Sequence, residues 1–292
     1  TGNRVRIEDK GEAYIEFANT SSSSSWASIA DMPDARTFMG TAALNGKIYL
    51  LGGYNGTQIN SCKVYDPLTN AWSAIANMSR GRDQHGATAL NGKIYVLGGW
   101  SSGYLGDGEV YDPLTDAWRA IADMPVPGRH LAVAVALNGK IYVLGGIGPG
   151  GAYLKRCDAY DTFNSTWHPP DTIADMPGAR AYMAAAALNG KIYVLGGYNG
   201  SKLDSCKVYD PGAGPPGVWS TIAPLPSARA DIGAVALNGK IYVLGGKKIG
   251  NAVLNSVAVY DPITNAWTEI DGMLYARANM GAVAVRDDNG VG

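Results

Sequence analysis

The chain has 292 residues, of which 46% are hydrophobic and only 17% are charged, and it contains 39 glycines. This composition favours short strands joined by tight turns over long helices with salt-bridged faces. The net charge of −1 provides no basic field for nucleic acid or an anionic membrane, and no apolar run approaches the about 18 residues that a membrane-spanning helix needs.

The N-terminal segment contains the first predicted strands. Residues 4–8 and 13–17 are two of them, and Trp26 is predicted to lie in a third, after a serine run at 21–25. No helical periodicity of useful length appears in this segment or in any later one. We therefore expect strands and turns from the start of the chain.

A unit of four predicted strands follows. Its strands lie at 40–44, at 47–51, at 61–65 and around Trp72 and Ile75. The turn after the first strand is Asn45-Gly46, the strongest short signal for a hairpin, because a type I′ turn needs positive φ at both central residues. The second strand ends at Gly52-Gly53, where backbones crowd together or φ is positive.

This unit is repeated along the chain. The segment LNGKIYVLGG begins at Leu90, Leu137, Leu188 and Leu237, and the near copy LNGKIYLLGG begins at Leu44. A tyrosine and a tryptophan follow each copy, in the pairs Tyr65 with Trp72, Tyr111 with Trp118, Tyr160 with Trp167, Tyr209 with Trp219, and Tyr260 with Trp267. One arginine stands at the same repeat position each time, at Arg36, Arg82, Arg129, Arg180, Arg229 and Arg277.

An apolar run, a Gly-Gly pair and a spaced Tyr and Trp resemble the Kelch motif. That resemblance covers essentially the whole chain and implies an all-β fold, a β-propeller in which each repeat forms one blade of four antiparallel strands. We expect a single domain over residues 1–292. Its repeats are predicted at about 36–81, 82–128, 129–179, 180–228 and 229–276, with a sixth blade from 277–292 plus 1–35.

The sixth blade is predicted from the chain length. Six blades share the 292 residues at about 49 each, close to the ~50-residue Kelch period. Residues 281–285 would supply the innermost strand and the N-terminal segment the other three, which closes the ring and removes open edges. The alternative is that residues 1–20 end a preceding module.

The cysteines and histidines do not indicate a metal site or a cofactor. Cys62, Cys157 and Cys206 each stand three residues before a repeat tyrosine, so they occupy equivalent places in different blades. Such places are too far apart for a disulfide, which needs Cα atoms within about 7 Å. Buried, unpaired thiols favour a reducing compartment, so a cytoplasmic location is expected over a secreted one.

Enzymes on this fold provide the catalytic alternatives. Galactose-oxidase-like proteins hold copper through Tyr and His, and six-bladed Kelch sialic-acid mutarotases use acid–base chemistry at one end of the channel. Candidates for such chemistry are Asp83, His85, Asp107, His130 and Asp231. No pair of them is set apart by ligand-like spacing or by opposed environments, so we predict that the chain is not an enzyme.

The six repeat arginines have two interpretations. An arginine at the start of each inner strand can hold backbone carbonyls of the adjacent blade through its five donors. It can also form part of an electropositive rim that captures carboxylates or phosphates. Both roles are compatible, so all six arginines are candidate binding residues.

Function is expected where the repeats differ. The loops that follow the glycine pairs vary strongly, and several begin with a large side chain, at Tyr54, Trp100, Tyr198 and Lys247. Exposed aromatic residues on loops are typical anchors of protein interfaces. Kelch substrate adaptors hold peptides on this face, which implies that these four residues and the repeat arginines form the site.

The predicted function is therefore a monomeric protein-interaction scaffold that binds a peptide segment of a protein partner. Adaptors that take acidic peptides often carry Ser beside the repeat arginine, and this chain has none, so acidity of the peptide is not predicted. A carbohydrate is the alternative ligand, because Tyr54 with Asn55 and Tyr198 with Asn199 would also suit sugars. Nucleic acid and membrane are not predicted partners.

Overall fold

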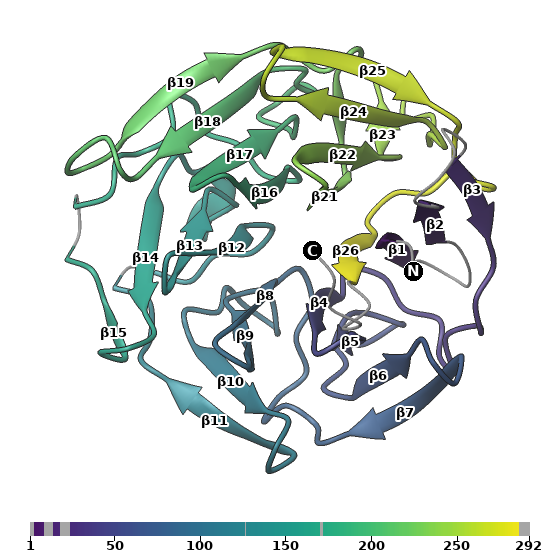
Figure 1. Ribbon diagram of the computed structural model, residues 1–292. Coiled ribbons are helices and arrows are strands. Elements are labelled where there is room, and N and C mark those ends of the chain that lie inside the picture. Colours follow the sequence, from purple (N-terminus) through teal and green to yellow (C-terminus); the bar gives the residue numbers. More distant parts are fainter. Residues whose placement is uncertain (1–2, 9–13, 18–23, 126, 170–171, 286–292) are drawn as a thin grey trace.

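The structure is a computed structural model that describes residues 3–8, 14–17, 24–125, 127–169 and 172–285. The strands form four-stranded antiparallel sheets arranged around a central axis, as in a propeller (Figure 1). The all-β propeller fold with four-stranded blades is thus confirmed. Within the described residues the one helical element is the 3-10 turn Pro149–Gly151, and no helix is long and apolar enough to cross a membrane.

Five blades lie within continuous stretches of chain, and we number them 1 to 5 in chain order. Blade 1 is β4 (Gly40–Leu44), β5 (Lys47–Leu51), β6 (Cys62–Asp66) and β7 (Ala71–Ile75); blade 2 is β8 (Gly86–Leu90), β9 (Lys93–Leu97), β10 (Gly108–Asp112) and β11 (Ala117–Ile121); blade 3 is β12 (Val133–Leu137), β13 (Lys140–Leu144), β14 (Cys157–Asp161) and β15 (Thr166–Trp167); blade 4 is β16 (Ala184–Leu188), β17 (Lys191–Leu195), β18 (Cys206–Asp210) and β19 (Val218–Ile222); blade 5 is β21 (Gly233–Leu237), β22 (Lys240–Leu244), β24 (Val257–Asp261) and β25 (Ala266–Ile270).

A further four-stranded sheet joins the two ends of the described chain. It contains β26 (Gly281–Val285), β1 (Asn3–Glu8), β2 (Tyr14–Phe17) and β3 (Ser24–Ala27), in that order. Strands β1 and β26 are antiparallel, with Arg4 opposite Val285 and Glu8 opposite Gly281. Figure 1 shows this sheet between blades 5 and 1.

The hairpin between the first two strands of each blade follows from its sequence. Asn45 and Gly46 have φ values of 50° and 71°, as a type I′ turn requires. The strand that follows, β5, is buried at every position after its lysine. The Asn-Gly signal and the uninterrupted apolar run therefore predicted both the turn and the central position of this strand in the blade.

The glycine pairs are required where neighbouring blades meet. Gly52 and Gly53 have φ values of 57° and 105°, which other residues rarely adopt. A Cβ on Gly52 would lie 2.6 Å from the carbonyl oxygen of Arg82, in the next blade. The amide of Gly53 donates to that same oxygen at 2.9 Å. Crowding and positive φ, both expected from the sequence, occur together here.

The repeat tryptophans link each blade to the preceding one. In blades 1 to 5 the indole packs on its tyrosine with ring centroids 5.0–5.3 Å apart. Its N–H donates to a carbonyl of the preceding blade, as from Trp118 to Ala76 at 2.8 Å and from Trp72 to Ala30 at 3.0 Å. Trp26 donates in the same way to Asp271 of blade 5 at 3.1 Å. The repeat tryptophans therefore join neighbouring sheets.

Candidate functional site

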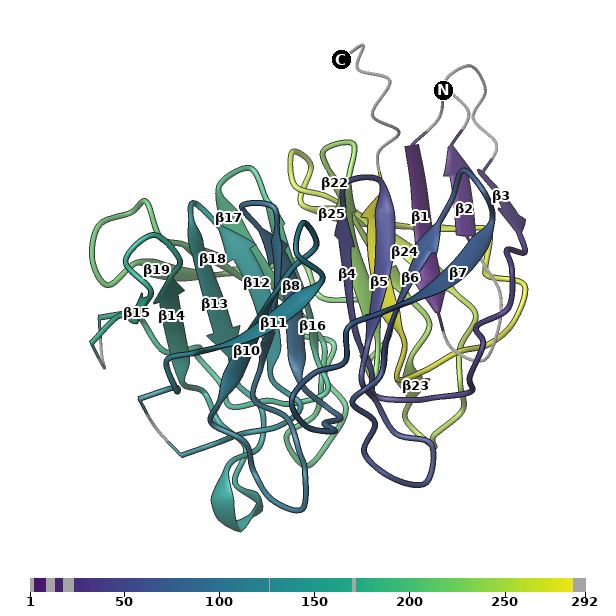
Figure 2. The same cartoon turned by 90° about the horizontal axis from the view of Figure 1, so that it is seen from below.

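The variable loops lie at one end of the ring. Strands β4 and β6 start at this end and β5 finishes there, so the loop after Gly53 and the segment around Arg36 share it. We call this end the loop face. In Figure 2 it is the lower edge, marked by β23 (Lys247–Lys248), which pairs with β20 (Arg229–Ala230).

The repeat arginines lie beneath this face rather than on it. All six are buried, with at most 6% of each residue exposed. Arg82 donates to the carbonyls of Gly98 and Asp107 in its own blade. Arg180 does the same with Gly196 and Ser205. The structural interpretation is correct in that backbone carbonyls accept from the arginine, and wrong in that these carbonyls belong to its own blade and not to the adjacent one. The reason is that the side chain folds back under the loop that follows the glycine pair.

The interpretation of the repeat arginines as an electropositive rim is wrong, because their side chains do not face solvent. The buried arginines are Arg36, Arg82, Arg129, Arg180, Arg229 and Arg277. Two blades neutralise the guanidinium with buried carboxylates, since Arg82 pairs with Glu109 at 2.9 Å and Arg129 pairs with Asp158. A side chain enclosed in this way holds the loops in place and does not offer its charge to a ligand.

The buried arginines give a testable stability difference. Arg82→Leu would leave Glu109, itself 3% exposed, without its cation, whereas Arg180→Leu would strand only neutral groups. We expect Arg82→Leu to cost about 2 kcal/mol more than Arg180→Leu in the free energy of unfolding, measured by urea denaturation. Adding Glu109→Ala, which copies Ala258 of blade 5, should recover most of that difference. Equal costs for the two single variants would contradict this view of the ion pair.

The mouth of the central channel is formed two residues after each arginine. We call the residues there the mouth ring, and they are Phe38, Gln84, Leu131, Tyr182, Asp231 and Asn279. All six have φ between 54° and 58°, which is unusual for side chains other than Gly and Asn. The amides of Gln84, Leu131, Asp231 and Asn279 each donate to the carbonyl of the mouth-ring residue before it, at 2.8–3.0 Å. These bonds hold a strained backbone in place around the axis.

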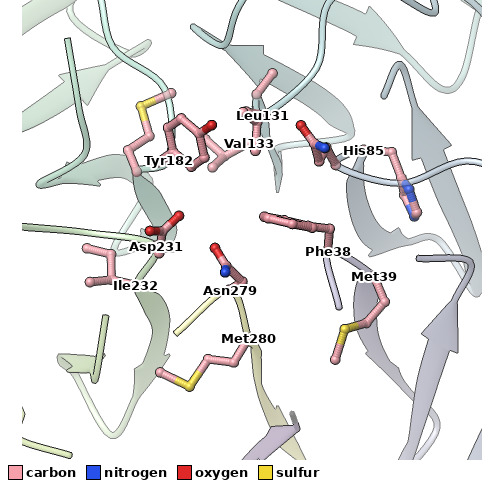
Figure 3. A pocket seen from close by; sticks show the side chains of 13 residues that line it. Phe38, Met39, His85, Leu131, Val133, Tyr182, Asp231, Ile232, Asn279 and Met280 are labelled. Atoms are coloured by element: carbon pink, nitrogen blue, oxygen red, sulfur yellow. The ribbon is translucent and has the colours of Figure 1, made fainter. Parts of the chain in front are cut away.

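Two cavities open at this ring and share four of its residues, Phe38, Tyr182, Asp231 and Asn279. The mouth cavity, of about 140 Å³, is lined by the ring and by apolar residues, among them Met183. Figure 3 shows two more of these, Met39 and Met280. The side chamber, of about 530 Å³, shares part of the ring and extends over blades 3, 4 and 5. Its walls include Tyr153 and Tyr198 from the loops.

The side chamber combines aromatic and charged groups. Tyr198 lies against Tyr153 and Tyr182, with centroids 5.8 and 6.4 Å away. Lys247 Nζ is 3.2 Å from Asp231 Oδ2. One orientation of the Asn279 amide links it to both residues. In that orientation its nitrogen donates to Asp231 Oδ1 at 2.6 Å and its oxygen accepts from Lys247 Nζ at 3.3 Å.

A second aromatic cluster lies on the loops of blades 2 and 3. Trp100 packs on Tyr104 and His130 with centroids 5.0 and 5.4 Å away. His130 Nδ1 is 2.5 Å from Gln84 Oε1, and burial lowers the pKa of His130. Trp100 therefore does not share the chamber with Tyr198 and Lys247. Tyr54, 38% exposed, lies outside both cavities and pairs with Thr37.

Of the catalytic candidates, His85 and Asp231 both line the mouth cavity, whereas Asp83, Asp107 and His130 line neither cavity. Burial lowers the pKa of His85 to about 3, and both its ring nitrogens lack partners within the described residues. Burial raises the pKa of Asp83, which accepts from Gln58. Asp107 pairs with Arg82, and Asp231 pairs with Lys247. Across the described part of the chain, no group of three or more His, Cys, Asp or Glu side chains could hold a metal ion.

Of the mouth ring, Asp231 alone was a candidate residue in the sequence, where it was named for catalysis. The likeness to adaptors points to the residue next to each arginine, whereas the residue one further along lines the channel. A signal was present, because that second position takes six different side chains between an invariant arginine and an apolar strand. In a repeat protein, the position that varies most on a constant scaffold is the place to look for specificity.

Comparisons with known proteins agree with this architecture. The family description "KLHDC2/KLHL20/DRC7 Kelch-repeats domain" matches residues 121–288, and the Kelch motif matches residues 35–79 and 81–125. The chain is similar to Kelch-like protein 7 of Gallus gallus and of Homo sapiens, each 54% identical over 143 residues, 47% of this chain and 24% of the relative. The match thus spans about a quarter of the length of these relatives.

A solved structure supports the fold. The structure titled "Structure of YjhT" superposes with a TM-score of 0.74, covering 89% of this chain and 92% of that one. The two sequences are 20% identical, so the likeness concerns the propeller architecture alone.

Proposed function

Because the chain belongs to the Kelch-repeat β-propeller family, we propose that its loop face binds a peptide segment of a protein partner. The observation that carries this proposal is the side chamber, whose lining comes from positions that differ between otherwise nearly identical repeats. Tyr198 and Lys247 lie in the chamber, and Trp100 and Tyr54 are proposed as contacts on neighbouring loops. The buried arginines act by fixing those loops.

The chamber has the properties of an anchor site. Tyrosines supply large, rigid contact area at a low entropic cost, and the Asp231–Lys247–Asn279 network supplies oriented donors and acceptors. The mouth ring below it is held by backbone bonds, so little ordering is needed on binding. A peptide side chain that enters the chamber would replace water at a preformed surface.

Selection from a displayed library of random 12-residue peptides tests the proposal. We expect Tyr198→Ala to weaken binding of a resynthesised selected peptide by at least about 30-fold, the effect of losing an anchor of about 2 kcal/mol. The matched control is Leu114→Ala, since Leu114 is 92% exposed on the turn after β10, at the opposite end of the blade. Full binding by Tyr198→Ala would refute the chamber as the site.

A carbohydrate is the second candidate ligand. Asp231, Lys247 and Asn279 present a connected set of donors and acceptors beside Tyr182 and Tyr198, an arrangement that also suits vicinal hydroxyl groups. An array of defined glycans distinguishes the two classes. Glycan binding that is lost in Asp231→Asn, without peptide selection, would favour the sugar, and turnover of a bound sugar would make the chain an enzyme.

We also propose that the two ends of the chain close the ring as blade 6, as the antiparallel pairing of β1 with β26 supports. Trp26 and Trp72 bond to Asp271 and Ala30, so blade 6 is joined to both of its neighbours. Residues 1–292 then form one domain of six blades. A closed ring keeps the mouth-ring residues at fixed distances, which the preformed site requires.

A further inference from the structure

The loop that leads from blade 5 to Arg277 departs from its counterparts. The residues three and two before the repeat arginine are Pro226 and Ser227 in the preceding loop, and Leu274 and Tyr275 here. Proline stands at the first of these positions in the loops before Arg36 and Arg180 as well. Leu274 is 50% exposed and Tyr275 is 58% exposed. The repeat scaffold therefore does not need these large side chains, since other blades fold without them.

The adjacent loop of blade 5 also exposes apolar side chains. Ile249 is 73% exposed and Val253 is 43% exposed. The two loops are tied together, because the amide of Arg277 donates to the carbonyl of Leu254 at 2.9 Å and the amide of Met273 donates to that of Asn255 at 2.8 Å. We call Ile249, Val253, Leu274 and Tyr275 the apolar ridge. The Tyr275 ring is held in place over the Arg277 guanidinium, 5.7 Å from its centroid.

The loop that carries Ile249 and Val253 of the apolar ridge also forms part of the side chamber. Lys247 and Asn251, from the same loop as Ile249, line the chamber. Lys202, from blade 4, also lines it and donates to Asn251 Oδ1 at 2.7 Å. Within the described residues Lys202 has no carboxylate partner, whereas Lys247 has Asp231. The ionised side chains of the chamber thus carry a net charge of +1, from two lysines and one aspartate.

We propose that the side chamber and the apolar ridge form one track, which binds an extended peptide segment carrying an acidic residue for Lys202 and a large apolar residue for the ridge. This inference rests on the proposed function and specifies its ligand. The unpaired ammonium favours a carboxylate, and the track would cover apolar groups that now face water. The acidic preference arises from loop lysines, so it does not need the serine beside the repeat arginine.

A peptide fits this track better than a second copy of the chain. A standard protein–protein interface takes roughly 20–30 residues from each partner, whereas the ten residues that line the chamber and the four of the ridge make 14. The loop lysines Lys202, Lys247 and Lys248 would also face their own copies across a symmetric contact, which brings like charges together. An acidic peptide segment needs only a small surface, and its negative charge complements the lysines.

Four versions of each selected peptide test the inference. The acidic position is Glu or Gln and the apolar position is Leu or Ser, and binding is measured by fluorescence polarisation. We expect Lys202→Gln to remove the preference for Glu over Gln, of about tenfold, while the preference for Leu remains. The double variant Leu274→Pro, Tyr275→Ser copies Pro226 and Ser227, and it should remove the preference for Leu while that for Glu remains.

The controls separate failure of this inference from failure of the proposed function. Tyr275→Ser alone tests the ridge if the double variant is unstable, and Leu114→Ser on the opposite face should change neither preference. Unchanged preferences in the Lys202 and ridge variants, with binding still lost in Tyr198→Ala, overturn the track and leave the chamber as the site. Dimerisation that is seen by sedimentation and lost in the ridge variant would also overturn it, by making the ridge a self-interface.

Discussion

Removal of residues 1–25 is expected to abolish cooperative unfolding of the propeller. Strand β26 pairs with β1, and β2 continues the same sheet, so the deletion takes away two whole strands and the start of β3. An inner strand would then present a free edge, and edges of this kind pair with other chains. The truncated chain should aggregate or melt broadly, as measured by size-exclusion chromatography and by thermal unfolding followed with circular dichroism.

A point variant distinguishes the effect of disrupting strand β1 from the effect of shortening the chain. Val5 lies opposite Ala284 on one side and Ile15 on the other, so β1 is an interior strand of its sheet. Val5→Pro removes a ladder donor there and should reproduce much of the truncation effect, whereas Val5→Ala should not. A truncated chain that stays monomeric and melts at the wild-type temperature would show that residues 1–20 belong to another module.

Loss of a repeat tryptophan is expected to have the second largest effect. Trp118 packs on Tyr111 and donates its indole N–H to Ala76 of blade 1. Trp118→Ala should lower the free energy of unfolding by roughly 3–5 kcal/mol, since it leaves a large cavity and an unpaired carbonyl between two blades. Urea denaturation of the full chain measures this cost.

Trp100 is the matched control for that experiment. It too is only partly buried, so exposure alone does not distinguish it from the repeat tryptophans. Its contacts are with Tyr104 and His130 on the loop face, and within the described residues its indole N–H bonds to no other blade. Trp100→Ala should therefore cost much less than Trp118→Ala. Similar costs would contradict the distinction between blade-joining and loop-face tryptophans.

The repeating part of the fold was predictable because its signals are local. Asn45-Gly46 specifies a turn, Gly52-Gly53 marks a close approach, and Trp72 marks the junction with the preceding blade, each through the chemistry of that residue type. Five registered copies reinforced every one of these signals. The partners of β1 were less evident, because pairing across the two ends of a chain depends on ring geometry.

The candidate site was only partly predictable, because its main features depend on three-dimensional placement. Arg82 could equally have faced solvent, and the acceptors that hold it under the loop lie 16 to 27 residues away, in the carbonyls of Gly98 and Asp107 and the carboxylate of Glu109. Phe38 and Tyr182 adopt left-handed φ values that their residue types disfavour, so no local rule would place them at the channel mouth. Tyr198 was predicted because an aromatic residue at the start of a variable loop is a local signal.

The most direct test of the account is to locate a bound peptide by methyl NMR. Met39, Met183 and Met280 line the mouth cavity, while Leu68 and Leu114 are exposed on turns at the opposite end of their blades. With methionine and leucine methyl groups labelled, titration of a selected peptide should shift the three methionine signals and leave both leucines unchanged. Shifts confined to Leu68 and Leu114, with the methionines unchanged, would place binding on the other face and contradict the proposed site.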